Sequence, residues 1–351
     1  MKIRVVVALT VAVFLSTCPP GRALAGQVPP DDGLRWKTVG APGNRGTLPS
    51  EAPRLPTDTP SVGAVGYEYR LTETEITRAQ WGEFVLAYRP FYSGNTPYWA
   101  NQAFVGSGFV GMGGVLYANP NQPANMSWEY AARYCNWLHN GKANTAAAFT
   151  QGVYDTTTFT RNPDGSLNHN LTHAAGARYW IPSLDEWIKG AYYDPNKHGV
   201  GLEGYWLYPA MQDTPLIPGA PGAGGQTNAA PFSADIPLNA GSYPGVVSPW
   251  GLLDLSGGMR EWTSTSRGNF DIEVRGSKLG PSLPDWEDRL DVLGGSGPAT
   301  SAHGFRLASS VPAPGSTVLF WVGAVPCVRR RRNHEVPLSH RPLVRRGAVY
   351  P

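Results

Sequence analysis

Apolar residues recur with the spacing of a helix face in only three stretches of this sequence, because glycine and proline interrupt the apolar pattern elsewhere. The chain has 42 glycines and 33 prolines among 351 residues, and both residue types weaken the interior of a helix or strand. The three stretches begin at Thr77, Ser127 and Ser183, whose hydroxyls are suited to capping a helix. Glu186, three residues after Ser183, completes a capping box. The sequence therefore predicts an α+β fold in which two to three helices surround short antiparallel sheets and long loops.

The first 25 residues have the three-part order of a secretory signal peptide. Lys2 and Arg4 precede an apolar run at 5–15, and the small-residue site Ala23-Leu24-Ala25 follows it. We therefore expect cleavage after Ala25 and a protein that is secreted or held in the cell envelope. Cys18 also permits cleavage as a lipoprotein, and the protein is exported on either reading.

The rest of the chain divides into four parts. Residues 26–61 are rich in proline and glycine and are interpreted as an extended lead-in. Periodic patterning begins near Val62, where a strand is expected to lead towards residue 76, so we assign one domain to residues 62–309. Residues 310–332 form a candidate sorting segment, and residues 333–351 form a basic tail.

The cysteine content limits the kinds of site that the chain can build. Only Cys18, Cys135 and Cys327 are present, which excludes a disulfide scaffold and a zinc site made of cysteines. Cys135 lies on the apolar face of the predicted second helix, so we expect its side chain to be buried in the core.

The formal net charge of +3 comes from the C-terminal end of the chain. The arginines concentrated there are Arg329 to Arg332, Arg341, Arg345 and Arg346. Without them the body of the protein is acidic, so the charge does not indicate a nucleic-acid partner.

Six short motifs follow one another along the body of the chain. They are TEITRAQW at 74–81, QPANMSW at 122–128, RYWIPSLDEW at 178–187, GLLDLSGGMREW at 251–262, VRGS at 274–277 and GFR at 304–306. In this order they resemble the motifs of the formylglycine-generating enzyme (sulfatase-modifying factor) family. The resemblance spans residues 62–308 and implies that family's C-type-lectin-like fold.

The chemistry of that family depends on sulfur ligands that this chain lacks. Family enzymes that convert a cysteine to formylglycine carry two cysteines just after their R-G-G-S motif, and these thiolates bind copper. Here Ser277 is followed by Lys278 and a loop that reaches Trp286 without a cysteine. The resemblance therefore implies a domain without copper, and we assign no catalytic residue.

Two histidines stand at a spacing that could serve a metal ion. His169 and His173 lie in the polar segment NHNLTH at 168–173. Isolated spacings of this kind are common in solvated loops, so we expect both side chains to be exposed rather than paired on a metal.

Calcium is the metal that the resemblance implies, as a structural ion held by oxygen ligands. One site carried over from the family consists of Asn228, Ala229 and Asp235. The other is the turn at 257–261, with Gly257, Met259 and Glu261 as its ligands. The family has asparagine where this chain has a glycine at position 258, which removes one side-chain oxygen from the second site.

An intact scaffold without catalytic thiols favours a binding function. We expect a groove that includes Ser277, Lys278, Asp285 and Trp286, where the family has its active site, and that binds a peptide, protein or glycan at the cell envelope. The alternative is an oxidoreductase of the formylglycine-generating type, or another metal-dependent oxygenase, acting on exported proteins. A structural envelope component without a ligand is the third possibility.

The segment after the domain resembles a degenerate PEP-CTERM sorting signal, which an exosortase processes in Gram-negative envelopes. VPAP at 311–314 precedes an apolar run at 318–328 and the cluster from Arg329 to Arg332. Ala313 replaces the usual glutamate, and Pro326 interrupts the apolar run. The run is shorter than the ~20 residues that span a bilayer, so envelope association would require processing; a solvated tail is the alternative.

Overall fold

The computed structural model describes residues 33–56, 61–111, 116–229, 238–280, 282–292 and 294–312. The predicted signal peptide and basic tail, and the predicted sorting segment from residue 313 onwards, lie outside these ranges. None of the helices in the described ranges combines the length and the apolar character that crossing a bilayer requires.

The helices in these ranges are short and differ in length. They are α1 (Arg78–Tyr88), α2 (Gln102–Val105), α3 (Trp128–His139), α4 (Ala146–Thr150), α5 (Leu184–Tyr192) and α6 (Pro284–Glu287). Single turns of 3-10 helix occur at Arg89–Phe91, Tyr98–Ala100, Thr156–Thr158 and Pro221–Ala223. The three longest, α1, α3 and α5, are the three helices that apolar periodicity predicted.

Antiparallel strands form three small sheets. The strands are β1 (Trp36–Val39), β2 (Tyr69–Thr72), β3 (Tyr179–Trp180), β4 (Tyr193–Asp194), β5 (Gly204–Tyr205), β6 (Glu261–Arg267), β7 (Asp271–Arg275), β8 (Gly295–Gly297) and β9 (Ala308–Ser310). The sheet orders are β1-β2-β9-β3, β4-β5 and β6-β7-β8. The mixed, loop-rich fold agrees with the prediction.

The first sheet joins segments that are far apart in the sequence. Leu71 of β2 pairs with Lys37 of β1 and with Ala308 of β9. β1 belongs to the segment interpreted as a lead-in, so the sheet extends into residues 26–61. The strand expected to begin near Val62 starts only at Tyr69, because that is where pairing with both neighbours begins.

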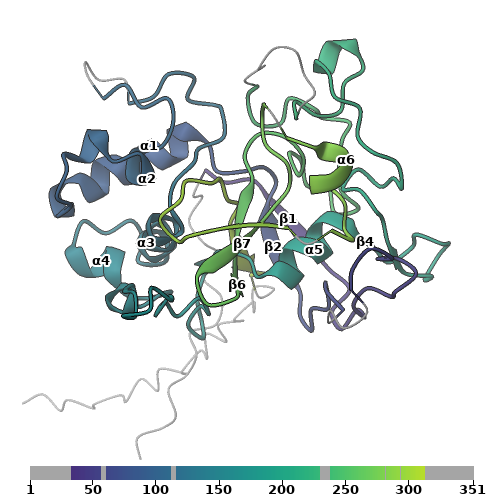
Figure 1. Cartoon of the computed structure of the whole chain (residues 1–351), viewed down its shortest axis with the longest axis horizontal. Coiled ribbons are helices and arrows are strands. Elements are labelled where there is room, and N and C mark those ends of the chain that lie inside the picture. The colour runs from purple at the N-terminus through teal and green to yellow at the C-terminus, as the bar shows by residue number, and fades with distance from the viewer. Residues whose placement is uncertain are drawn as a thin grey trace, which may run out of the picture. The chain divides into compact units, whose positions relative to one another are not determined.

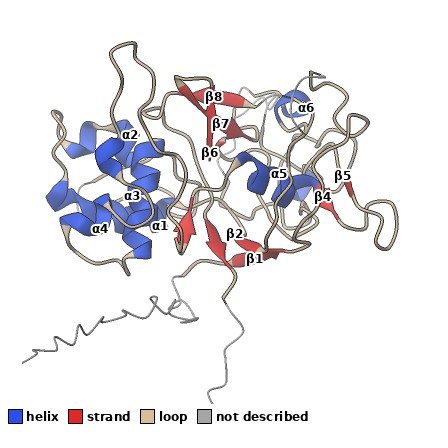
Figure 2. Ribbon diagram, turned by 90° about the horizontal axis from the view of Figure 1, so that it is seen from below, coloured by secondary structure: helices blue, strands red, loops and turns tan. Residues whose placement is uncertain are grey.

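The β1-β2-β9-β3 and β6-β7-β8 sheets lie between two groups of helices. Helices α1 to α4 gather on one side of the strands, and α5 and α6 lie on the other side (Figures 1 and 2). Aromatic side chains fill the side formed by α1 to α4. Trp81 is fully buried there, and the centre of its ring lies 4.7 Å from that of Phe84. Its Nε1 donates to Phe104 O at 2.9 Å. The buried aromatic rings carry most of the apolar area in this part of the core.

The predicted helix starts are confirmed by their capping contacts. Thr77 and Ser127 accept hydrogen bonds from the backbone N–H groups three residues later, at Gln80 and Tyr130. Ser183 Oγ accepts from Glu186 N at 3.2 Å, and Glu186 Oε2 accepts from Ser183 N at 2.8 Å. Each contact satisfies a donor that the helix itself leaves unpaired.

We predict that Ser183→Ala lowers the free energy of unfolding by about 1 kcal/mol, the usual loss for a missing N-cap. The effect arises because Glu186 N loses its acceptor while the rest of α5 is unchanged. Urea unfolding measures the difference. Ser50→Ala is the matched control, since Ser50 is exposed and caps no helix; an equal loss in both variants would contradict the assigned cap.

Candidate functional site

Ser277, which ends the VRGS motif, lies in the interior of the protein. Its side chain is fully buried, and its Oγ is 2.9 Å from Asp288 Oδ2. Its backbone N–H donates to Asp288 Oδ1 at 2.7 Å, and Ser256 Oγ donates to Oδ2 at 2.5 Å. Asp288 therefore encloses the Ser277 side chain and accepts several hydrogen bonds. The sequence did not single out Asp288 as a central residue.

The carboxyl group of Asp288 is itself fully buried at the C-terminal end of α6. Burial raises its pKa to about 7, although the bonds from Ser256 and Ser277 favour the charged form. The cluster is thus a buried carboxyl held by two hydroxyls. Because the whole cluster is enclosed, a ligand cannot reach the Ser277 side chain in this conformation.

The other residues of the predicted groove lie closer to solvent. Asp285 and Trp286 are exposed on α6, and Lys278 is half-buried. The guanidinium of Arg54 lies 5.4 Å from the centre of the Trp286 ring. The structure therefore brings Asp285 and Trp286 together on the surface and separates them from the buried Ser277.

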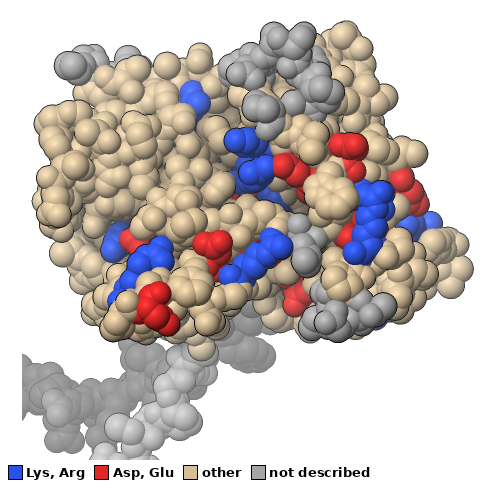
Figure 3. Space-filling view, in the orientation of Figure 1, with Lys and Arg blue, Asp and Glu red and all other residues tan. Residues whose placement is uncertain are grey.

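Charged side chains on the face shown in Figure 3 are interspersed, with basic and acidic groups beside one another. Ion pairs among the described residues include Arg260 with Glu287 and Arg45 with Glu51. Paired charges of both signs do not make the continuous basic surface that nucleic acids require.

Cys135 is buried on α3, as its place on the apolar face predicted. Its side chain has no exposed surface, and burial raises the pKa of its thiol well above the usual range. A neutral, enclosed thiol is a poor nucleophile and a poor metal ligand. Cys135 therefore does not replace the cysteines that are missing after Ser277.

The residues of the first predicted calcium site lie close to the turn of the second. Asn228 and Ala229 are buried, and Asn228 Oδ1 accepts a hydrogen bond from Gly258 N at 2.9 Å. Ala229 forms bridges with Leu279 and Gly280. Asp235 lies outside the described residues, so a calcium ion held by these three residues stays a prediction.

The residues of the second predicted calcium site take part in hydrogen bonds within the protein. Gly257 N donates to Ser277 Oγ at 3.0 Å, and Met259 N donates to Glu75 Oε1 at 2.9 Å. The carboxylate of Glu261 is buried and accepts from Arg306 through both oxygens. Arg306 thus engages the only side-chain oxygens among these three residues, and calcium at this turn stays a prediction.

Glu75 was missed as a residue of this region, although it is part of the first motif. It is almost fully buried, and burial raises the pKa of its carboxyl well above the usual range. A side chain at Gly258 would place its Cβ only 2.3 Å from Glu75 Oε2. The glycine that departs from the family motif therefore makes room for this carboxyl, and that departure was the signal in the sequence.

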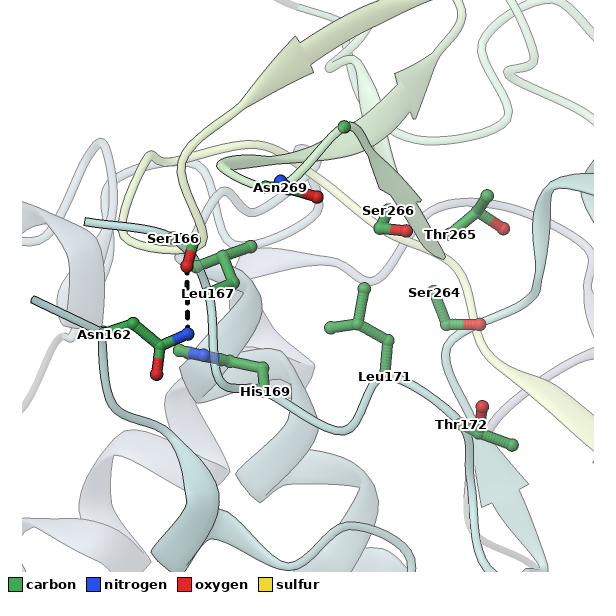
Figure 4. Close-up of a pocket in the computed structure, with 11 residues that line it drawn as sticks. Asn162, Ser166, Leu167, His169, Leu171, Thr172, Ser264, Thr265, Ser266 and Asn269 are labelled. Carbon is green, nitrogen blue, oxygen red and sulfur yellow. Dashed lines mark hydrogen bonds between the residues drawn. The ribbon is translucent and has the colours of Figure 1, made fainter. Parts of the chain in front are cut away.

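A separate cleft of about 710 Å³ opens between the segment at 162–172 and strand β6 with its following turn. Figure 4 shows its walls, with Leu171 between the two segments and the Asn162 amide bonded to Ser166. Its lining residues are Asn162, Ser166, Leu167, His169, Leu171, Thr172, Ser264, Thr265, Ser266, Gly268 and Asn269. The polar groups are hydroxyls, amides and one imidazole. We call this the hydroxyl cleft.

His169 has its side chain buried in the wall of the hydroxyl cleft. The expectation that its side chain is exposed to solvent was therefore wrong. Its side chain is only 1% exposed, its Nε2 lies 3.0 Å from Glu129 Oε1, and its ring stacks on Phe159 at 4.7 Å. His173 stacks on Trp180 instead. The two imidazoles thus serve different neighbours, and the described part of the chain holds no cluster of three or more His, Cys, Asp or Glu side chains arranged for a metal ion.

Comparisons with known proteins identify the kind of domain. The family profile described as "Sulfatase-modifying factor enzyme 1-like domain" matches residues 45–311. CarF shares 14% identity over 79% of this chain and 98% of its own, with a TM-score of 0.45. PvdO from Pseudomonas aeruginosa shares 15% identity over 80% of this chain and 96% of its own, with a TM-score of 0.45. Treponema denticola variable protein 1 shares 15% identity over 79% of this chain and 95% of its own, with a TM-score of 0.44. No curated protein sequence matches the chain.

Proposed function

This chain belongs to the family of sulfatase-modifying factor enzyme 1-like domains, and on that premise we propose that it is an exported, non-catalytic member that binds a partner at the cell envelope. The family match agrees with the fold expected from the six motifs. The partner classes are a peptide, a protein or a glycan.

The observation that carries this proposal is the absence of accessible sulfur at the family's reaction site. The loop that follows Ser277 contains no cysteine, and Cys135 is enclosed in the core. Copper in the Cu(I) state selects thiolate ligands, and an enclosed neutral thiol does not supply one. The residues present therefore do not fit the copper ion of the family enzymes.

Export and envelope association rest on the two ends of the sequence. The order of basic, apolar and small residues before Gly26 supports secretion. The apolar run and arginine cluster after residue 317 support a sorting segment of the PEP-CTERM type. Together they support a binding domain that is secreted or held in the cell envelope.

We predict that the purified protein leaves a cysteine-containing sulfatase-type peptide unchanged when it is supplied with copper and oxygen. Mass spectrometry of the peptide detects the conversion of cysteine to formylglycine. A family enzyme that retains both cysteines is the positive control. The Cys135→Ala variant is assayed in parallel, and it is expected to give the same result because the thiol is enclosed.

Formylglycine product would overturn the non-catalytic assignment. Product that persists in Cys135→Ala would favour the alternative, an oxygenase with ligands other than sulfur. That alternative requires ionisable side chains that converge near Ser277. Asp288 is buried there, and the partly buried Glu287 is paired with Arg260, so neither carboxyl group is an open ligand.

A further inference from the structure

We propose that the hydroxyl cleft binds an uncharged oligosaccharide. This inference rests on the proposed binding function and specifies the class of ligand and the place where it binds. The cleft lies between the 162–172 segment and the β6–β7 hairpin, and none of the predicted groove residues is among its lining residues.

The side chains that line the hydroxyl cleft divide into a fixed frame and a set of available groups. Thr265 Oγ1 accepts from Leu184 N at 3.0 Å, and the Asn162 amide donates to Ser166 Oγ at 2.9 Å. These contacts hold the walls. By contrast, the side chains of Thr172, Ser264, Ser266 and Asn269 make no hydrogen bond to any other described residue, and they supply the groups that face a ligand (Figure 4).

The walls of the cleft are joined to each other and to the helical side. Leu167 N donates to Asn269 O at 2.8 Å, which ties the 162–172 segment to the hairpin turn. His169 ties the same segment to α3 through Glu129. A cleft held in this way is largely formed before a ligand enters, which reduces the ordering cost of binding.

The charge of the cleft favours a neutral ligand. No Asp, Glu, Lys or Arg is among its lining residues. Two acidic groups bonded to lining residues are engaged: Glu129 contacts His169, and Asp164 accepts from Ser166 Oγ at 2.6 Å. Burying an unpaired charge against such walls is costly, whereas hydroxyl and amide groups exchange hydrogen bonds with sugar hydroxyls.

An exposed aromatic ring stands at the rim of the cleft. Phe270 follows Asn269 in the hairpin turn and is 50% exposed. Its ring lies 3.9 Å from the position that a Cβ on Gly165 would occupy, so it stands beside the opposite wall. An apolar ring face at this place can cover one face of a sugar ring while the hydroxyl groups bind its edges.

An extended peptide is the less suitable occupant because the strand edge is already used. β6 is the edge strand of its sheet, the position to which a peptide strand would add. However, Trp262 N donates to Gly304 O at 2.9 Å and Ser264 N donates to Pro182 O at 2.8 Å. With these backbone donors occupied, recognition depends on side-chain hydroxyls instead.

Calorimetric titration of the purified full-length protein tests this proposal. The neutral probes are cellohexaose, chitohexaose and maltohexaose, the charged probe is hexagalacturonate, and an uncharged peptide of similar length is included. We expect at least one neutral probe to bind. Phe270→Ala is expected to weaken this binding by about tenfold, as expected for the loss of a contact with an aromatic face, and Ser266→Arg is expected to abolish it by filling the cleft.

Ser50→Ala is the control, since Ser50 lines a different cleft, one of about 760 Å³. Circular dichroism and thermal unfolding of each variant separate lost binding from lost folding, and Asn269→Ala provides a third, milder change. Absence of binding by every neutral probe, binding of only the charged probe or the peptide, or binding unaffected by the cleft variants would overturn the proposal.

The outcomes distinguish this inference from the proposed function. Formylglycine product together with cleft-dependent sugar binding would remove the non-catalytic assignment and keep the oligosaccharide site. Peptide binding without sugar binding or product would keep the non-catalytic binding domain and remove the oligosaccharide site.

Discussion

Replacing Arg306 with leucine is expected to lower the free energy of unfolding by about 3–5 kcal/mol, the range found when one partner of a buried ion pair is removed. Arg306 is fully buried, and its Nη2 and Nε lie 2.5 and 2.6 Å from the two oxygens of Glu261. Trp187 Nε1 also donates to Glu261, at 2.8 Å. Without the guanidinium, the Glu261 carboxylate would remain in the core with no compensating charge.

Arg306 also joins three distant segments, which adds to the expected loss. Its Nη1 donates to Thr72 O at 3.2 Å, and its Nη2 donates to Leu253 O at 3.0 Å. Thr72 is the last residue of β2, and Leu253 belongs to the 251–262 motif. The substitution therefore leaves buried acceptors unpaired as well as a buried charge.

Chemical unfolding measures the loss, with Arg35→Leu as the control. Arg35 pairs with Glu73 at 2.8 Å, but its side chain is 73% exposed, so the expected change is at most about 1 kcal/mol. The double variant Arg306→Met with Glu261→Gln should recover part of the stability, because no charge is then buried alone. Equal losses for Arg306→Leu and Arg35→Leu would contradict the role given to the buried pair.

The stability of Asp288→Asn relative to the wild type is expected to rise between pH 4 and pH 7. Burial raises the pKa of Asp288 from 3.8 to about 7 in the folded protein. The protonated form is favoured by folding, so its contribution is fully present below about pH 4 and is lost as pH rises through about 7. The total is on the order of 4 kcal/mol. Asparagine imitates the protonated carboxyl and does not ionise.

Urea unfolding of both proteins at a series of pH values measures this effect. The stability of Asp288→Asn relative to the wild type should rise steadily from pH 4 to pH 7 and level off above it. Asp285→Asn, an exposed carboxyl on the same helix, controls for the loss of one acidic group. A difference that stays constant with pH, or that falls, would show that Asp288 is ionised throughout in the folded protein.

The regular elements could be predicted because their signals are local. Thr77, Ser127 and Ser183 cap the helices that follow them, and the burial of Cys135 follows from its place on the apolar face of α3. β1 was not predicted as part of the sheet, since its strand is defined by pairing with β2 more than thirty residues later. Local patterns give no information on such partners.

The candidate sites could be predicted only in part. The missing cysteines after Ser277 are visible in the sequence and limit the chemistry directly. The sequence did not indicate that Asp288 would enclose Ser277 or that the 162–172 segment would meet β6 across a cleft. For Glu75, its one signal was the glycine at position 258. The contact of Glu75 with the 257–261 turn and the cleft join residues that are distant along the chain, whereas Asp288 lies eleven residues after Ser277.

By itself, the sequence determined the helix starts, the order of the family motifs and the absence of thiolate ligands, because capping, periodicity and ligand chemistry are properties of residues and their close neighbours. Only the tertiary structure decided which carboxyls are buried, which hydroxyls remain available and where a cleft opens. These properties depend on packing between distant segments, which sets the solvation and the hydrogen-bond partners of each group.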